Sequence, residues 1–461
     1  MQKPNRHSTH LPRRLAPLAA AVMLAFGHTV SASPSSTIVV QNCNDHGTGS
    51  LRAAVNGAAS GSTIDLSQLS CSTITLTGGS IQIPQAALLL SGPGASQLTI
   101  DGGASTQHYN RIIHHTGTGQ LTMTGLTLTD AKYKPTGAEA LGACVYSKGL
   151  ALISGSTLTG CIAVANNGND ARGAAIAAEN GLTMLNSSVT GNLADSVGTG
   201  NASGGGIYCN GPLTMKYSTV SSNSVLSSNG LAINGGGIIT TSGDVVIFAS
   251  TIANNYSAGS EGGILISHPN GNPDNSARII NSTISGNRAA RAPAGLRTQN
   301  ALTLANSTVA FNAAQSNGGF GGGIQLQAPL NLQSSIVADN SSNIGDDDLY
   351  TGDQAVTGAN NLVTQHSGST TLPIDTITSC PLLGPLSDNG GTTLTHRLLT
   401  NSPALDAGNN DTGFSGNPLS FDQRGDGHPR TFNGVTDIGA FEYGGGTGDE
   451  IFRSGFEGRC R

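Results

Sequence analysis

The sequence predicts an all-β fold, a right-handed single-stranded parallel β-helix (β-solenoid) with a short N-terminal helical cap and an irregular C-terminal cap. Three observations indicate this fold. A motif repeats every 25 to 32 residues, its short β-branched segments are separated by Gly, Asn and Ser, and these segments lack the spacing of an amphipathic helix. Such a repeat corresponds to one solenoid coil, with strands stacked about 4.8 Å apart.

The core of the repeat is a Ser, then a Ser or Thr, then an aliphatic residue. These aliphatic residues are Leu158, Val189, Val220, Ile252, Ile284, Val309 and Ile336. Three positions later stand Asn192, Asn223, Asn255, Asn287 and Asn312, with Cys161 and Asp339 in the outer repeats. A second aliphatic position recurs in step at Val145, Ile176, Ile207, Ile238, Ile264, Leu296 and Ile324. We expect two buried aliphatic columns and a ladder of asparagine hydrogen bonds inside a turn.

Glycine triplets at 204–206, 235–237 and 321–323 precede the second aliphatic position. We expect backbone with φ above zero there. A phosphate-binding loop is the alternative, but no long helix follows these glycines, so the structural interpretation is favoured.

The N-terminal cap is predicted from residues 50–59. Ser50 is a suitable N-cap, Leu51, Ala54 and Val55 fall on one helix face, and Gly61 follows the end. This helix would cover the unpaired strands at the start of the solenoid.

Residues 1–32 resemble a secretory signal peptide. Lys3, Arg6 and two further arginines precede an apolar run from 15 to 26, and Val30-Ser31-Ala32 suits cleavage before Ser33. A membrane anchor is the alternative, but about a dozen apolar residues are too few for the roughly 30 Å hydrocarbon core. We therefore expect no transmembrane span in the mature chain and an extracellular or cell-surface location, with the periplasm as the alternative.

The charge of the mature chain argues against nucleic-acid binding. Removal of residues 1–32 deletes four basic and no acidic residues, which leaves 17 basic against 27 acidic residues. A nucleic-acid-binding face needs the opposite balance.

Seven cysteines are present, and an exported protein can form disulfides. We expect a disulfide between Cys43 and Cys71, because both lie in the predicted N-terminal cap. The pairing of the other cysteines stays open at this point: Cys144, Cys161, Cys209, Cys380 and Cys460.

Two segments carry a family resemblance. Residues 43–55, followed by Ile74-Thr75-Leu76, resemble the N-terminal cap of bacterial secreted parallel β-helix proteins, which are related in shape to polymorphic outer-membrane proteins and pectate lyases. The motifs at 381–386, 388–391, 393–396, 402–408, 422–425 and 437–442 resemble the choice-of-anchor domain that ends many such proteins. The resemblance implies an extracytoplasmic β-helix protein whose biochemical activity is mostly unassigned.

The domain boundaries follow from these assignments. We expect a signal peptide at 1–32, an N-terminal cap and first coils at 33–100, and β-helix repeats at 101–345. A choice-of-anchor-like module would occupy 346–443, and a Gly-rich linker and C-terminal tail 444–461.

No candidate set forms a complete catalytic or metal site, so we assign no catalytic, cofactor-binding or metal residue. Asp346-Asp347-Asp348 with Asp353 could bind Ca²⁺ as a loop, although a solvated acidic turn is the favoured interpretation. The pair His114-His115 has no third ligand nearby and is assigned to a surface strand or loop. The basic residues along the coils are Arg278, Arg288, Arg291 and Arg297. In the C-terminal module we interpret the following as a structural network rather than an active site: Asp406, Asp422, Arg424, Arg430, Asp437 and Glu442.

The leading functional hypothesis is a secreted or cell-surface structural and interaction protein, adhesin-like, whose lateral faces contact an extracellular glycan or cell-surface component. The alternative is a polysaccharide lyase or hydrolase acting on extracellular glycans. A groove with several acids and a Lys or Arg would favour the enzyme, and flat Ser/Thr/Asn faces would favour binding.

Overall fold

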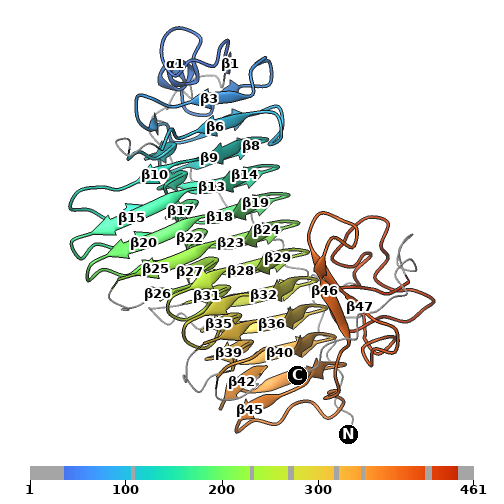
Figure 1. Cartoon of the computed structure of the whole chain (residues 1–461). Helices are drawn as coiled ribbons and strands as arrows, with labels where there is room; N and C mark the ends of the chain where they lie inside the picture. Colours follow the sequence, from blue (N-terminus) through green and yellow to red (C-terminus); the bar gives the residue numbers. More distant parts are fainter. Residues whose placement is uncertain are drawn as a thin grey trace, which may run out of the picture. The chain divides into compact units, whose positions relative to one another are not determined.

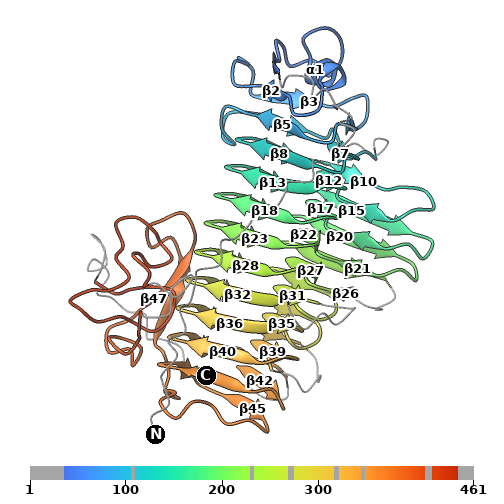
Figure 2. The ribbon, with the colours of Figure 1, turned by 180° about the vertical axis from the view of Figure 1, so that it is seen from behind.

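The repeats fold into the coils of a parallel β-solenoid, which confirms the predicted fold class (Figures 1 and 2). The computed structural model describes residues 36–104, 109–228, 233–267, 275–315, 321–343, 348–410 and 418–444. The predicted signal peptide and C-terminal tail lie outside these ranges. Each full coil contributes one strand to each of three long parallel sheets, in the order C, A, B along the chain.

Sheet A contains β1 (Thr37–Val39), β2 (Thr63–Asp65), β5 (Leu88–Ser91), β8 (Gln120–Thr124), β13 (Leu150–Ser154), β18 (Leu182–Leu185), β23 (Leu213–Lys216), β28 (Val245–Phe248), β32 (Ser276–Ile280), β36 (Ala301–Ala305), β40 (Leu330–Gln333) and β43 (Val356–Ala359). Sheet B contains β3 (Thr73–Thr75), β6 (Thr99–Asp101), β9 (Thr127–Thr129), β14 (Thr157–Thr159), β19 (Ser188–Thr190), β24 (Thr219–Ser221), β29 (Thr251–Ala253), β33 (Thr283–Ser285), β37 (Thr308–Ala310), β41 (Ile336–Ala338) and β44 (Leu362–Val363). Sheet C contains β4 (Ile81–Ile83), β7 (Ile113–His115), β12 (Val145–Ser147), β17 (Ile176–Ala178), β22 (Ile207–Asn210), β27 (Ile238–Ser242), β31 (Ile264–Ile266), β35 (Leu296–Thr298), β39 (Ile324–Leu326), β42 (Leu349–Gly352) and β45 (His366–Gly368).

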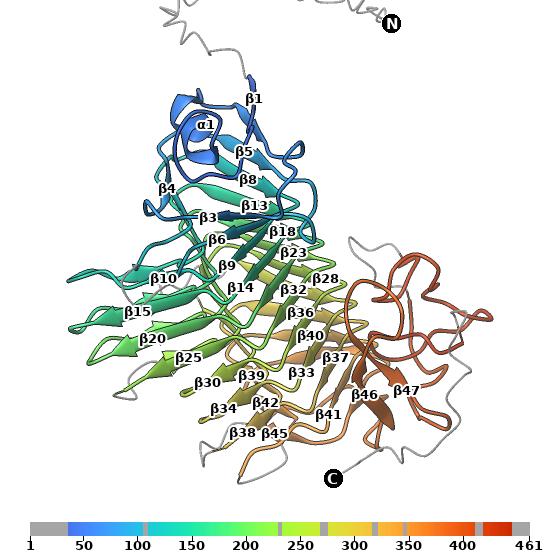
Figure 3. The ribbon, with the colours of Figure 1, turned by 45° about the horizontal axis from the view of Figure 1, so that its top comes forward.

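Between sheets B and C, several coils extend outward as an arm that the sequence did not predict (Figure 3). The outgoing strands form sheet D: β10 (Lys132–Tyr133), β15 (Ile162–Asn166), β20 (Leu193–Val197), β25 (Ser224–Ser227), β30 (Tyr256–Ser257), β34 (Arg288–Ala289) and β38 (Ala313–Ala314). The returning strands form sheet E: β11 (Ala140–Leu141), β16 (Ala171–Arg172), β21 (Ala202–Ser203) and β26 (Ile233–Asn234).

The core is a set of aliphatic columns that run along the solenoid axis. Val189 stacks on Leu158 and Val220, and Ile207 stacks on Ile176 and Ile238, with all six side chains inaccessible to solvent. Both predicted aliphatic columns are therefore confirmed through the central coils.

Polar ladders fix the two turns that flank sheet B. Before the sheet, each ladder serine accepts a hydrogen bond from the backbone N–H of its counterpart in the preceding coil, as from Ser187 to Ser218 at 3.1 Å. After the sheet, Asn223 Nδ2 and backbone N–H donate to Asn255 Oδ1 at 2.9 and 3.0 Å, and the pattern repeats from coil to coil. Because each buried amide pairs with the next coil, the predicted asparagine ladder is confirmed.

The last repeat departs from the predicted register by one residue. Val337, and not Ile336, stacks on Val309, and Asn340, and not Asp339, continues the asparagine ladder. The sequence misleads here because Ser334-Ser335-Ile336 satisfies the motif, whereas the ladder serine is Ser335.

Glycines allow the coils to approach each other before sheet C. The first glycine of two triplets has positive φ, at +60° for Gly204 and +64° for Gly235, as expected. The third has a different role: a Cβ on Gly237 would lie 2.7 Å from the carbonyl oxygen of Gly263 in the next coil.

The N-terminal cap forms as predicted. Helix α1 (Leu51–Gly57) begins after Ser50, whose side chain accepts a hydrogen bond from Ala53 N at 3.2 Å. Cys43 and Cys71 form a disulfide in this region. A second disulfide, whose pairing the sequence left open, joins Cys144 to Cys161, and Cys209 is a buried free thiol.

Solenoid strands continue to β45, beyond the boundary predicted between residues 345 and 346. The final coil was not recognised because Asn361 replaces the ladder serine, where it accepts from Ser335 N at 3.1 Å. The chain then crosses the end of the solenoid, where Leu372 packs against the core. No described helix is long and apolar enough to cross a membrane.

The C-terminal module docks against the side of the solenoid (Figures 1 and 3). It contains an antiparallel pair, β46 (Leu383–Ser387) and β47 (Thr395–Leu398), and irregular loops. Its polar groups bond to the outer face of sheet B over several coils, as in Thr251 Oγ1 to Leu394 O at 2.7 Å and Ala440 N to Thr308 Oγ1 at 3.1 Å.

Substitution of Val220 by Asp tests the column register. A carboxylate there would enter an apolar column without a partner, and we expect it to lower the free energy of unfolding by about 3–5 kcal/mol. Thr214→Asp, at a partly exposed position of the same coil, should change it by about 0.5 kcal/mol or less. Equal denaturant midpoints for the two variants would show that Val220 does not face the interior.

Candidate functional site

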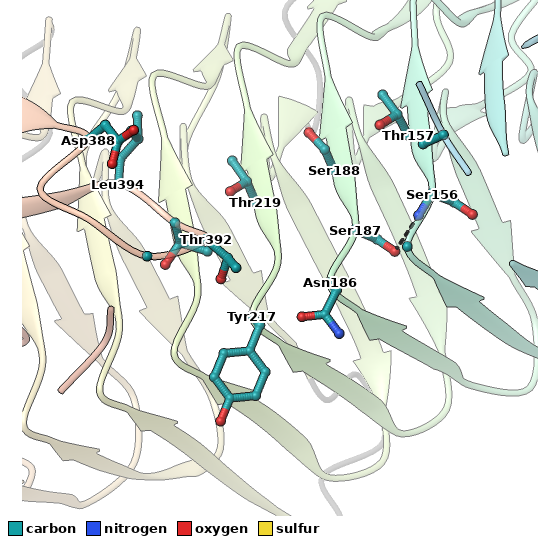
Figure 4. A pocket seen from close by; sticks show the side chains of 14 residues that line it. Ser156, Thr157, Asn186, Ser187, Ser188, Tyr217, Thr219, Asp388, Thr392 and Leu394 are labelled. Atoms are coloured by element: carbon teal, nitrogen blue, oxygen red, sulfur yellow. Dashed lines mark hydrogen bonds between the residues drawn. The ribbon is translucent and has the colours of Figure 1, made fainter. Parts of the chain in front are cut away.

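A groove lies where the C-terminal module meets the uncovered part of sheet B, and we take this groove as the candidate functional site (Figure 4). The cavity has a volume of about 410 Å³, within the usual size range of small-molecule sites. It is lined by Ala95, Gly155, Ser156, Thr157, Asn186, Ser187, Ser188, Tyr217, Thr219, Asp388, Gly391, Thr392, Thr393 and Leu394.

One wall of the groove is a column of hydroxyl groups. Thr157, Ser188 and Thr219 follow the ladder serines of three successive coils and pair directly in register on the outer face of sheet B. The only hydrogen bond drawn among the lining residues in Figure 4 joins the ladder serines Ser156 and Ser187, so the three outer hydroxyls stand clear of that ladder. We call Thr157, Ser188, Thr219, Thr251, Thr283 and Thr308 the hydroxyl column.

The floor of the groove includes an aromatic ring on strained backbone. Tyr217 has φ +50°, at a turn position where the preceding coil places Asn186 with φ +48° and the following coil places Ala249 with φ +46°. The left-handed conformation costs a bulky L-residue roughly 1–2 kcal/mol. The Tyr217 ring is 37% exposed and packs edge-on against Phe248 at 5.6 Å between centroids. An exposed aromatic ring that lines a cavity and is held on strained backbone is typical of a binding position.

The opposite wall is the module loop from 388 to 394. Asn389 Nδ2 donates to Thr395 O at 2.8 Å, and Gly390 N donates to Asp388 Oδ1 at 3.0 Å. The Thr393 hydroxyl donates to Ala249 O on the solenoid at 3.3 Å. These bonds fix a loop that presents the exposed Asp388 carboxylate and the exposed Thr392 hydroxyl to the groove.

A buried ionic network holds the module together, as the sequence interpretation proposed. Arg424 forms a bidentate contact with Asp422 and stacks on Phe441 at 3.9 Å. Arg430 donates to Gly439 O at 2.8 Å and lies 3.7 Å from Glu442. Asp437 Oδ1 accepts from Asp406 N at 2.8 Å, so Asp406, which is exposed, joins the network through its backbone N–H and not through its carboxylate as expected. With both arginines fully buried, the network serves structure and is closed to a substrate.

His396 anchors the module to the solenoid. Its ring nitrogens lie 2.7 Å from Ser285 Oγ and 2.7 Å from Gly384 O. Burial lowers the pKa of His396 to about 4, so the ring is neutral at physiological pH and its two hydrogen bonds need no charge.

A second cavity of about 350 Å³ lies at the turn between sheets B and D. It is lined by Asn254, Gly286, Arg288, Phe311, Ala313, Asp339 and Ser341. One of the basic residues noted in the sequence, Arg288, lines this cavity.

Three of the noted arginines lie on three different sheets, and the fourth, Arg291, lies in the turn between β34 and β35. Arg278 is exposed on sheet A, Arg288 is exposed on sheet D, and Arg297 lies on sheet C. Arg297 Nε is 2.8 Å from the carboxylate of Glu261, which has no solvent exposure. Burial raises the pKa of Glu261 to about 8.

The two histidines separate onto opposite faces of β7. His115 is buried, with Nδ1 2.8 Å from Ser147 Oγ, so its assignment to a surface strand was wrong. His114 faces outward against Tyr146, at 5.4 Å between ring centroids. Both positions follow from the alternation of side chains along a strand.

The sequence missed an ionic and aromatic cluster that joins the arm to sheet C. The Arg111 guanidinium lies 3.7 Å from the centroid of the Tyr133 ring and donates to Leu141 O at 2.8 Å. Arg172 pairs with Asp170 and lies 3.4 Å from Glu139. Because these cations already have partners, the cluster fixes the arm in place.

The favoured interpretation of Asp346-Asp347-Asp348 as a solvated acidic turn is wrong for Asp348, and the described residues do not support the calcium-binding alternative either. Asp346 and Asp347 lie outside them, and Asp348 is buried, where its Oδ1 accepts from Asn340 N and Nδ2 at 2.8 and 2.9 Å. Asp348 thus ends the asparagine ladder. Within the described ranges, no three His, Cys, Asp or Glu side chains gather in a way that could hold a metal ion.

No protein-family model matches the chain, and no curated protein is similar to it. Among solved structures, the crystal structure of pectate lyase Pel9A is similar with a TM-score of 0.40 and 14% sequence identity, over 89% of this chain and 97% of that chain. The choice-of-anchor resemblance therefore stays a hypothesis.

The buried Asp348 carboxyl group should make the free energy of unfolding depend on pH. Burial raises its pKa to about 6, so the folded chain holds this proton more tightly than the unfolded chain, and stability falls as pH rises from about 4 to about 6. Asp348→Asn keeps the acceptor for Asn340 and should remove roughly 3 kcal/mol of this fall. Urea unfolding at several pH values measures it, and Asp353→Asn, at an exposed position, serves as control. A pH profile of Asp348→Asn that overlies the control would contradict the assignment.

Proposed function

We propose that the protein is an exported carbohydrate-binding protein, a structural and interaction protein outside the cytoplasm whose groove receives part of a glycan chain. The observation that carries this proposal is the lining of the groove. It combines three hydroxyls in a row, the Asn186 amide, the Asp388 carboxylate and the exposed Tyr217 ring.

These groups complement a sugar. Hydroxyl and amide groups both donate and accept, as sugar hydroxyls do, and a carboxylate accepts strongly from them. An aromatic ring offers a flat apolar surface with low conformational-entropy cost. Asp388 is the only charged side chain among the lining residues, and no lining residue is basic, so we expect an uncharged glycan.

Export is supported by two kinds of observation. Residues 1–32 have the pattern of a signal peptide, and two disulfides lie within the described chain. Disulfides persist chiefly in oxidising compartments outside the cytoplasm. A cell-surface or extracellular location follows as part of the proposal.

The substitution Tyr217→Asn tests the groove. Asparagine tolerates left-handed backbone, so the melting temperature should stay the same or rise, while loss of the ring should weaken glycan binding about tenfold, or about 1.4 kcal/mol. A glycan array selects the ligand and titration calorimetry gives its Kd. Tyr109→Asn, at a tyrosine that is 38% exposed and absent from the groove lining, is the control. Equal affinities for the two variants would refute the assignment of this groove.

A second candidate function is a polysaccharide lyase or hydrolase, favoured by the second cavity. Arg288 and Asp339 line that cavity together, which places a cation and a carboxylate at one site. A lyase needs a cation beside the carboxylate of the substrate and a base for its α-proton.

Depolymerisation assays distinguish this function from binding alone. The mature chain is incubated with neutral and acidic polysaccharides, and reducing ends and the absorbance of unsaturated products are followed. If the second cavity is an active site, Arg288→Ala abolishes the signal, and Arg278→Ala on the exposed face of sheet A leaves it unchanged. No signal with the unaltered chain, at any polysaccharide that it binds, rejects this second candidate.

A further inference from the structure

One side chain of the C-terminal module, Gln423, is hydrogen-bonded to two hydroxyls of the hydroxyl column. Gln423 is fully buried, and its carboxamide bridges two successive coils. Thr283 Oγ1 donates to Gln423 Oε1 at 2.6 Å, and Gln423 Nε2 donates to Thr251 Oγ1 at 2.9 Å. The same amide nitrogen lies 3.0 Å from Thr393 Oγ1 and 3.1 Å from Leu394 O. Two neighbouring hydroxyls of the column thus bind both ends of one amide.

This amide-binding arrangement continues directly into the groove. Thr219 precedes Thr251 in the column, and Ser188 precedes Thr219, each paired in register. Strand stacking sets the same spacing, about 4.8 Å, between each neighbouring pair of hydroxyls. Thr393 and Leu394 contact Gln423 and also line the groove. The groove therefore offers an equivalent pair of hydroxyls, Ser188 and Thr219, which lies two coils along the column from the pair that holds Gln423 and is open to a ligand.

We propose that the groove recognises an N-acetylated amino sugar, whose acetamido group binds the open hydroxyls of the column. In this proposal the acetamido carbonyl accepts from Thr219 and the acetamido N–H donates to Ser188. Tyr217 and Asp388 line the same groove, where the ring and the carboxylate are available to the rest of the sugar. This inference rests on the proposed glycan-binding function and names its ligand class.

The chemistry of the amide makes this choice selective. An acetamido group is neutral and presents one acceptor and one donor, which matches a hydroxyl pair that carries no charge. A site built to hydrogen-bond a polar group discriminates strongly against an analogue that lacks it. A plain hexose has a hydroxyl in place of the acetamido group, and it cannot span two coils as Gln423 does.

Calorimetric titration with two matched trisaccharides tests the proposal. The trimers of N-acetylglucosamine and of glucose, both β-1,4-linked, differ at carbon 2, and we expect the acetylated trimer to bind at least tenfold more tightly. Thr219→Val removes the proposed donor and keeps the β-branched shape, so it should reduce this preference to less than threefold. Thr183→Val, on the outer face of sheet A in a neighbouring coil, is the control and should keep the preference. Thermal melts verify that both variants fold.

The outcomes separate this inference from the proposed function. Equal affinity for the two trimers overturns the acetamido site and leaves glycan binding in place. A preference that Thr219→Val does not alter also overturns it, because the acetamido group then binds elsewhere. Failure of the chain to bind either trimer or any glycan on an array overturns both proposals.

Discussion

The structure depends on the register in which successive coils hydrogen-bond. Because each backbone strand pairs with its counterpart in the next coil, a residue type that recurs in the sequence becomes a column in space. Inward columns of Val and Ile form the core, and the turns beside sheet B are held by asparagine and serine ladders. A buried amide in one coil requires a partner in the next, so the ladders also need defined ends. The backbone N–H of Cys161 donates to the first asparagine, and Asp348 accepts from the last.

The same register creates the outer surface on which the candidate site lies. The hydroxyl column runs along sheet B, and the C-terminal module covers its lower part, where Thr251, Thr283 and Thr308 bond to module groups. The upper part, from Thr157 to Thr219, stays open and ends at the module loop, which makes the groove. The buried arginine network and neutral His396 keep the module rigid, so one wall of the groove is fixed against the other. The position of the candidate site is therefore set by the last coil of sheet B that the C-terminal module covers.

The fold could be predicted from the sequence because ladders require identical residues at fixed spacing. The aliphatic columns, the asparagine ladder and the Ser50 helix cap follow from local patterns, and the register failed where Ser334-Ser335 offered two alignments. The groove could not be predicted in the same way. Its two walls come from positions such as Thr219 and Asp388 that are distant in sequence, and the docking bonds join residues about 140 apart, such as Thr283 and Gln423. Such contacts leave no periodic signal, although the Thr and Ser beside each ladder serine marked the column itself.

The most direct measurement is a crystal structure of the mature protein with the N-acetylglucosamine trimer bound. We expect electron density for an acetamido group between the Ser188 and Thr219 hydroxyls, with its carbonyl toward Thr219 and a sugar ring beside Tyr217, in the arrangement that Gln423 adopts between Thr251 and Thr283. An ordered sugar in the cavity beside Arg288, or a groove free of sugar when the trimer saturates the protein, would contradict the assignment of the hydroxyl column as the binding surface.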